Sequence, residues 1–93
     1  MPITPYNLVR HELIGLEVEI KESTNKNQVG LKGSVIDETF KTLKIETDKG
    51  EKIIPKDITI FIFKLPNGTR VQVEGKILLG RSEDRIKKKL PRW

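Results

Sequence analysis

The side chains of this chain that could do chemistry are mainly cationic, and they gather at its C-terminal end. Residues 81–93 contain six basic and two acidic side chains, a net charge of +4, whereas residues 1–80 carry twelve basic and eleven acidic ones, a net charge of +1. A nearly neutral body with a basic end is typical of proteins that contact a polyanion through that end. The same charge would also serve a protein that is merely soluble.

A second candidate contact is the polar run from Ser23 to Gln28, which has no apolar anchor. Lys26, two asparagines and a glutamine could donate hydrogen bonds to phosphates or to base edges. Such a run is also typical of a simple connecting loop. Few aromatic side chains could be exposed, and the main candidates are Tyr6, Phe40 and Trp93. Recognition of RNA by shape and phosphate contacts is therefore favoured over reading of single-stranded bases.

Residue patterns for a protein-based active site are missing. The carboxylates are scattered, and the adjacent Asp37 and Glu38 would face opposite ways on a strand, so they cannot easily share a metal. Glycine loops for phosphate, nucleophile elbows and metal-ligand spacings are not found. The chain has no cysteine and a single histidine, His11, which excludes a disulfide framework and a thiolate zinc site. We expect no catalytic residue and no metal ligand set here.

The length and composition favour one small β domain over residues 1–93. Apolar residues make up 35% of the chain, a low share, and closure of a sheet into a barrel suits so compact a core. No apolar run approaches the ~20 residues of a membrane span, and the N-terminal residues lack a signal-peptide pattern. We expect a cytosolic protein.

The hairpin that organises the predicted barrel extends from Gly30 to Glu46. A bent strand, a turn at residues 39–41 and a second strand are expected, and Gly33 marks a bulge or sharp coil inside the first strand. Leu43 and Ile45 should point to the core. We predict a small, strongly bent antiparallel barrel of about six strands, the others being residues 16–22, 52–54, 58–65 and 70–74, with the last continuing past Gly75.

Two predicted helices flank the strands. Thr4 and Pro5 begin the first one and Gly15 ends it, while Ser82 caps the second one and Pro91 ends it. The apolar stripe of the first helix must dock either on the open end of the barrel or on a partner protein. The run from Ile58 to Leu65 is apolar on both faces, so its second face should meet a terminal segment or another protein.

Several stretches, in order and over nearly the whole chain, resemble a known family. They are His11–Leu16 (HELIGL), Ser23–Asn25 (STN), Val35–Thr39 (VIDET), Thr42–Glu46 (TLKIE), Ile54–Lys56 (IPK) and Gly80–Lys88 (GRSEDRIKK). Together they resemble archaeal ribonuclease P protein component 1, of the Pop4/Rpp29 family. Ser82 stands where proline is expected, and serine caps a helix equally well.

The resemblance implies an Sm-like or SH3-like barrel with helical ends. It implies a subunit of an RNA-based endoribonuclease that removes the 5′ leader from precursor tRNA. The implied partners are the ribonuclease P RNA, a zinc-binding (Rpp21-like) ribonuclease P protein and other ribonuclease P proteins, with precursor tRNA contacted indirectly. No cofactor is expected in this chain, because magnesium ions are used by the RNA, and the expected location is the cytoplasm.

On that basis we predict an electrostatic and architectural role. The predicted RNA-binding residues are Lys26, Lys32, Lys41, Arg70, Arg81, Arg85, Lys87, Lys88 and Lys89. The predicted partner-binding residues are Tyr6, Leu8, Val9, Leu13, Phe61 and Phe63. Two alternatives stay open: a ribosome- or translation-associated RNA-binding barrel, and a protein-interaction module without RNA.

Overall fold

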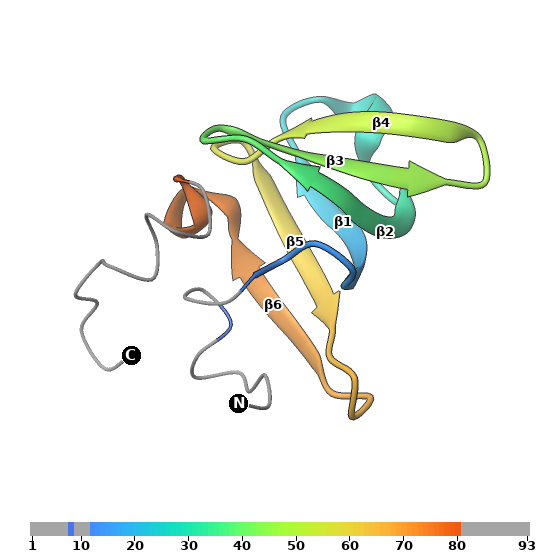
Figure 1. The fold of residues 1–93 in the computed structure, drawn as a ribbon. Coiled ribbons are helices and arrows are strands. Elements are labelled where there is room, and N and C mark those ends of the chain that lie inside the picture. Colours follow the sequence, from blue (N-terminus) through green and yellow to red (C-terminus); the bar gives the residue numbers. More distant parts are fainter. Residues whose placement is uncertain (1–7, 9–11, 81–93) are drawn as a thin grey trace.

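One antiparallel sheet of six strands forms the body of the protein (Figure 1). The computed structural model describes Leu8 and residues 12–80. The order of the strands in the sheet is β4-β3-β2-β1-β5-β6. The elements are β1 (Glu17–Ser23), η2 (Lys26–Gln28), β2 (Lys32–Glu38), β3 (Thr42–Thr47), β4 (Gly50–Pro55), β5 (Thr59–Lys64), β6 (Arg70–Glu74) and η3 (Gly75–Leu78), where η2 and η3 are short 3₁₀ helices.

The strands form where apolar and polar residues alternate. Val18 and Ile20 of β1 are buried, and so are Leu43 and Ile45 of β3, while their neighbours face solvent to a greater extent. Alternation of this kind buries one face of a strand and leaves the other wet. The predicted inward residues of these two strands are confirmed, as is the mainly β, antiparallel character of the fold.

The sheet bends sharply near its centre. The register shifts between Ile20 and Glu22 where β1 meets β5, and between Val35 and Asp37 where β2 meets β3. Such bulges increase the local twist of a strand. Figure 1 shows the result, because β3 and β4 lie at a steep angle to β5 and β6.

Gly33 permits this bend because β2 and β3 approach closely there. A Cβ atom at residue 33 would lie 2.1 Å from the main-chain carbonyl oxygen of Glu46. The bulge expected at Gly33 is not found there, because the register of β2 shifts two residues later, between Val35 and Asp37. Gly33 instead marks a close contact between two backbones.

The core lies inside the bend. Phe61 and Phe63 of β5 are fully buried, with their ring centroids 5.7 Å apart. Leu8 and Leu13, from the N-terminal part of the chain, are fully buried in the same cluster. The N-terminal apolar residues were expected to dock either on the protein's own sheet or on a partner protein. Leu8 and Leu13 dock on the protein's own sheet.

The predicted closure of the sheet into a barrel is wrong. Strand β4 pairs with β3 alone and β6 with β5 alone, so both remain edge strands in the part of the chain that the structure describes. The physical reason lies at Gly75, where the chain turns into η3 instead of continuing as a strand. A Cβ atom there would lie 1.8 Å from the carbonyl oxygen of Lys56, so the backbones are in contact at this turn. Among Leu8 and residues 12–80, no strand bridges the two edges.

The two predicted terminal helices fall mainly on residues 1–7, 9–11 and 81–93, which lie outside the described residues. Leu8 and residues 12–80 contain no α-helix. Among these residues no helix is long and apolar enough to cross a membrane.

Candidate nucleic-acid interface

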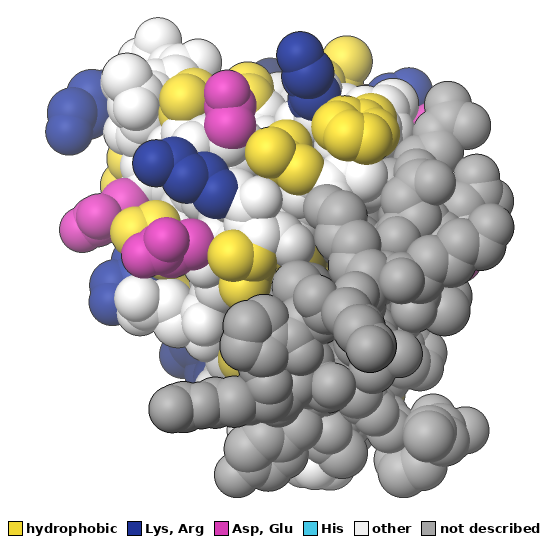
Figure 2. Space-filling model, turned by 90° about the vertical axis from the view of Figure 1, so that its left-hand side faces the viewer, with side chains coloured by type: hydrophobic (Ala, Val, Ile, Leu, Met, Phe, Trp, Pro, Cys, Tyr) yellow, Lys and Arg dark blue, Asp and Glu magenta, His cyan; other side chains and the backbone are white. Residues whose placement is uncertain are grey.

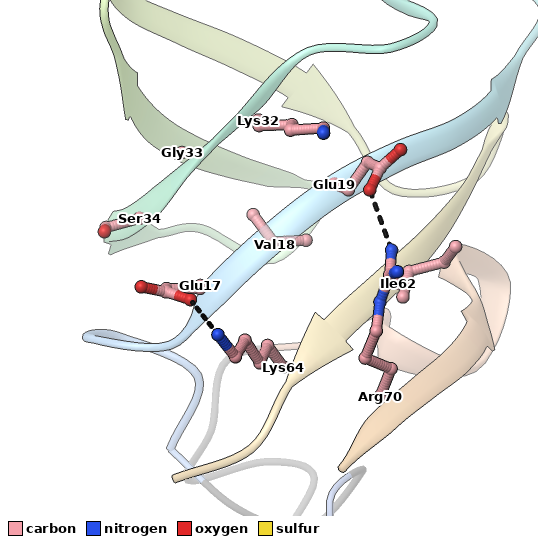
Figure 3. Close-up of a pocket in the computed structure, with 9 residues that line it drawn as sticks. All are labelled: Glu17, Val18, Glu19, Lys32, Gly33, Ser34, Ile62, Lys64 and Arg70. Carbon is pink, nitrogen blue, oxygen red and sulfur yellow. Dashed lines mark hydrogen bonds and ion pairs between the residues drawn. The ribbon is translucent and has the colours of Figure 1, made fainter. Parts of the chain in front are cut away.

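A groove of about 480 Å³ lies on the solvent face of the sheet, across β1, β2, β5 and β6 (Figure 3). Its cationic side chains are Lys32, Lys64 and Arg70, and its carboxylates are those of Glu17 and Glu19. The remaining lining residues are Val18, Gly33, Ser34 and Ile62.

Strand pairing brings these charges together. Glu19 of β1 lies opposite Lys32 of β2, and Glu17 lies opposite Lys64 of β5. Lys64 in turn lies directly opposite Arg70 of β6. Like charges directly opposite each other on a sheet are destabilising. Broken local rules of this kind are often found at functional sites, and two adjacent cations can attract an anion.

The carboxylates hold the cations only weakly. Lys64 Nζ lies 3.7 Å from Glu17 Oε2, and Arg70 Nη2 lies 2.9 Å from Glu19 Oε1. The Lys64 and Arg70 side chains remain 57% and 60% exposed, and ion pairs between exposed groups contribute about 0–1 kcal/mol. Figure 3 shows both cations reaching toward β1. A phosphate group can therefore replace the carboxylates as their partner.

Lys32 completes the cationic side of the groove. It is exposed at the start of β2 and forms no ion pair with the residues that the structure describes. Figure 3 shows its side chain extending toward β1, on the same side of the sheet as Glu19.

The structure brings together two of the predicted RNA-binding residues, Lys32 and Arg70. Lys26 lies apart from them in η2, and Lys41 lies at the β2–β3 turn; both are exposed. The other predicted RNA contacts lie outside the described residues: Arg81, Arg85, Lys87, Lys88 and Lys89.

Sequence reasoning missed Lys64. Its signal was present, because alternation along residues 58–65 places Lys64 on the face opposite Phe61 and Phe63. The tight turn at residues 66–68 then sets the hairpin register that pairs Lys64 with Arg70.

Four of the six predicted partner-binding residues lie in the core and not on the surface. The side chains of Leu8, Leu13, Phe61 and Phe63 are fully buried in the protein's own core, and thus have no surface to offer a partner. On β5 the half-exposed face carries Ile60 and Ile62 instead. Tyr6 and Val9 lie outside the described residues.

The sequence of this chain matches a known family over most of its length. The model of the family Ribonuclease P/MRP, subunit p29, matches residues 6–88. A protein of Methanocaldococcus jannaschii named ribonuclease P protein component 1 is 56% identical over 89 residues, which are 95% of this chain and 93% of that protein. A protein of the same name from Thermofilum pendens is 45% identical over 94 aligned residues and covers all of both chains.

A solved structure agrees with these sequences. It is described as Mth11, a homologue of human RNase P protein Rpp29, and it superposes with a TM-score of 0.60 at 47% identity. The match covers 82% of this chain and 99% of that one. The sequence, the fold and the order of the matching stretches all lead to one assignment: this chain belongs to the ribonuclease P/MRP subunit p29 family.

Proposed function

We propose that this chain is a protein subunit of ribonuclease P that binds and stabilises the catalytic RNA while the 5′ leader is removed from precursor tRNA. Family membership supports the assignment to the ribonuclease P holoenzyme. The single structural observation that carries RNA binding is the pairing of Lys64 directly opposite Arg70, in a groove that Lys32 also lines from the far side of β1.

The groove would act by neutralising phosphates. Arg70 offers a planar set of donors that matches two phosphate oxygens, and Lys32 and Lys64 offer compact charges on either side of β1. Glu17 and Glu19 repel any phosphate placed over β1 itself. This alternation would therefore direct the RNA backbone toward β2 or toward the β5–β6 hairpin, which sets its position without reading bases.

Protein partners form a second part of the proposal. The resemblance suggests a zinc-binding ribonuclease P protein and other subunits. Because the described members of the predicted contact set are buried, Tyr6 and Val9 are the members still available as predicted contacts. In this assembly the RNA uses magnesium ions, this chain contributes no cofactor, and the complex works in the cytoplasm.

The groove is tested by binding the full chain to ribonuclease P RNA at several salt concentrations. We expect the logarithm of the binding constant to fall linearly with the logarithm of the salt concentration, by about 0.7–0.9 for each phosphate contact. The variant with Lys32→Gln, Lys64→Gln and Arg70→Gln should bind more weakly, with a slope smaller by about two to three.

The matched control neutralises three cations of the β3–β4 hairpin, Lys44, Lys49 and Lys52, and should leave the slope close to that of the wild type. Equal slopes for the groove variant and the wild type would remove the groove from the RNA contact. Recovery of RNA from cell extract on the tagged chain separates the two alternatives: ribosomal RNA would favour a translation-associated protein, and no RNA would favour a protein-interaction module.

A further inference from the structure

Phe40 is exposed at the tip of the β2–β3 turn. Its residue surface is 52% accessible, and it is the aromatic member of the exposed large hydrophobic residues that the structure describes. An exposed aromatic ring offers a flat apolar face on which another ring can stack.

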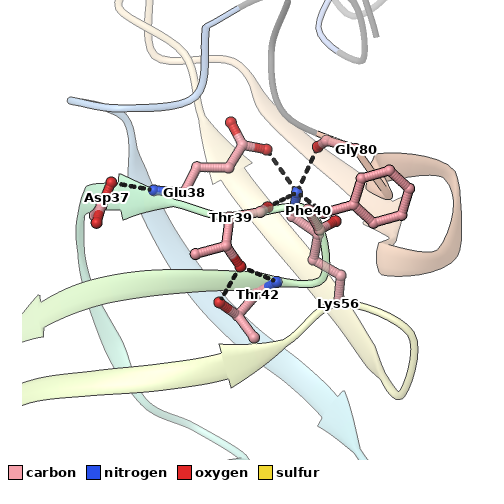
Figure 4. Close-up of polar contacts among 7 residues, drawn as sticks. All are labelled: Asp37, Glu38, Thr39, Phe40, Thr42, Lys56 and Gly80. Atoms are coloured by element: carbon pink, nitrogen blue, oxygen red, sulfur yellow. Dashed lines mark hydrogen bonds and ion pairs between the residues drawn. The ribbon is translucent and has the colours of Figure 1, made fainter. Parts of the chain in front are cut away.

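The backbone that carries this ring is held firmly (Figure 4). The Phe40 carbonyl oxygen accepts a hydrogen bond from the Gly80 amide at 2.8 Å and one from Lys56 Nζ at 3.4 Å. On the other side of the turn, the Thr39 amide donates to the Thr42 carbonyl oxygen at 3.0 Å. A ring on a fixed backbone loses little conformational freedom when something stacks on it.

Two exposed lysines lie on the turns that meet at the backbone of Phe40. Three turns meet here: residues 39–41, 56–58 and 75–79. The Lys56 amide donates a hydrogen bond to the Lys41 carbonyl oxygen, and the Gly80 amide donates one to the Phe40 carbonyl oxygen. The exposed charges of the three turns are Lys41, Lys76 and one carboxylate, Asp57. The basic residues 81–93 follow directly in the sequence.

The exposed surface at the ring is small and mixed. The backbone of Phe40 is bonded to Gly80 (Figure 4), which follows η3, and η3 carries Ile77, 43% exposed. Figure 2 shows the face onto which these turns project, with hydrophobic side chains lying among Lys, Arg and a few acidic side chains. Lysine is depleted at the centres of protein–protein interfaces, and one ring with one half-exposed isoleucine offers little apolar area to a protein. A ring next to a lysine matches one nucleotide, its base and its phosphate.

We propose that Phe40 is a stacking site for an unpaired base of the bound RNA and that Lys41 contacts the adjoining phosphate. The inference rests on the proposed RNA-binding function and adds to it a site that tolerates any base, because every base has a flat face. Phosphate contacts in the groove position the RNA, and the ring holds one nucleotide that is not in a helix.

The test measures the affinity of the full chain for ribonuclease P RNA with Phe40→Ala, Phe40→Leu and Phe40→Trp. We expect the alanine variant to bind about 5- to 100-fold more weakly. The leucine variant should bind nearly as weakly, because it is apolar but cannot stack, and the tryptophan variant should bind at least as tightly as the wild type. The ring carries no charge, so these variants should keep the salt slope, while Lys41→Gln lowers it by about one.

Two controls separate stacking from loss of structure or of general apolar surface. Ile53→Ala removes an exposed side chain from β4, 59% accessible, and should leave RNA affinity unchanged. In a chain that also carries Trp93→Phe, the Phe40→Trp variant has a single tryptophan, and stacking should quench its fluorescence when RNA binds.

Wild-type affinity in the leucine variant, or no quenching of the tryptophan, would overturn the stacking site. So would variants that keep RNA binding but lose a co-purifying ribonuclease P protein, because the ring would then be a protein contact. If wild-type chain binds no ribonuclease P RNA, the proposed function itself fails; if only the Phe40 variants behave like wild type, the groove proposal stands and the stacking site alone is lost.

Discussion

Lys56 and Glu38 form an ion pair inside the protein, with Nζ 2.7 Å from Oε2 and with 0% and 3% of the two side chains exposed. Lys56 Nζ also donates to the carbonyl oxygens of Thr39 at 2.9 Å and Gly80 at 2.8 Å (Figure 4). A buried ammonium is tolerated only when its protons find partners in this way. The contacts join the β2–β3 turn, the residue after β4 and the residues after η3. They tie together the two ends of a sheet that does not close.

The first prediction removes this ammonium. Lys56→Met should lower the free energy of unfolding by about 3–5 kcal/mol, because the buried Glu38 carboxylate would lose the ammonium charge 2.7 Å away. The variant that carries both Lys56→Met and Glu38→Met should lose less unfolding free energy than the two single variants lose together. The difference should be about 0.5 kcal/mol or more, as expected for residues in contact. Urea unfolding of the four proteins measures this cycle, and additive losses would show that the pair is not coupled.

The second prediction concerns the close approach of β2 and β3. Gly33→Ala should destabilise the protein by about 1–3 kcal/mol or more, because the new Cβ must displace the backbone at Glu46. The adjacent Ser34→Ala, at an exposed position, should stay within about 0.5 kcal/mol of the wild type. Thermal unfolding of both variants decides, and equal stability would mean that the strands separate there at little cost.

The third prediction tests the placement of β5. Phe61→Ala should cost about 3–5 kcal/mol of unfolding free energy, as expected for an aromatic ring that is fully buried. Ile62→Ala, on the half-exposed face of the same strand, should cost clearly less. A stable Phe61→Ala chain that had lost only its protein partner would instead support the sequence-based prediction that Phe61 is a partner contact.

The fourth prediction changes the acidic side of the groove. Glu17→Gln with Glu19→Gln should raise the affinity for ribonuclease P RNA, by up to about fivefold for each carboxylate, because Lys64 and Arg70 lose their competing partners. The matched control is Glu51→Gln, which removes the exposed partner of Lys44, 3.4 Å away, on the β3–β4 hairpin. Filter binding at one low salt concentration is sufficient, and a drop in affinity would show that the carboxylates themselves contact the ligand.

The fifth prediction concerns the basic end of the sequence. Neutralising Arg85, Lys88 and Lys89 together should reduce the salt slope of RNA binding by about two to three. Combined with the groove variant, the two reductions should add, since separate phosphates are involved. An unchanged slope in the first variant would remove these three residues from the RNA site.

Local patterns in the sequence were sufficient to predict which residues of each strand face inward, and the ordered matching stretches indicated the family. Alternation of apolar and polar residues is a local property, so the inward positions of Val18, Ile20, Leu43 and Ile45 could be predicted without knowing any neighbour. The turn at residues 66–68 is also local. The alternation could be predicted because side-chain direction on a strand depends only on the backbone of that strand.

How the ends of the sheet meet, and which charges share a site, depend on contacts between distant parts of the chain. Lys56 follows Pro55 like any surface lysine, yet it is buried because Glu38, 18 residues before it, and Gly80, 24 residues after it, supply its partners. Lys32 lies on β2 and Arg70 on β6. They share a groove because β1 and β5, which lie between these strands, form its floor. Lys64 joins them through the pairing of β5 with β6. Contacts between residues so far apart depend on strand order and on the bend of the sheet, which no local pattern encodes.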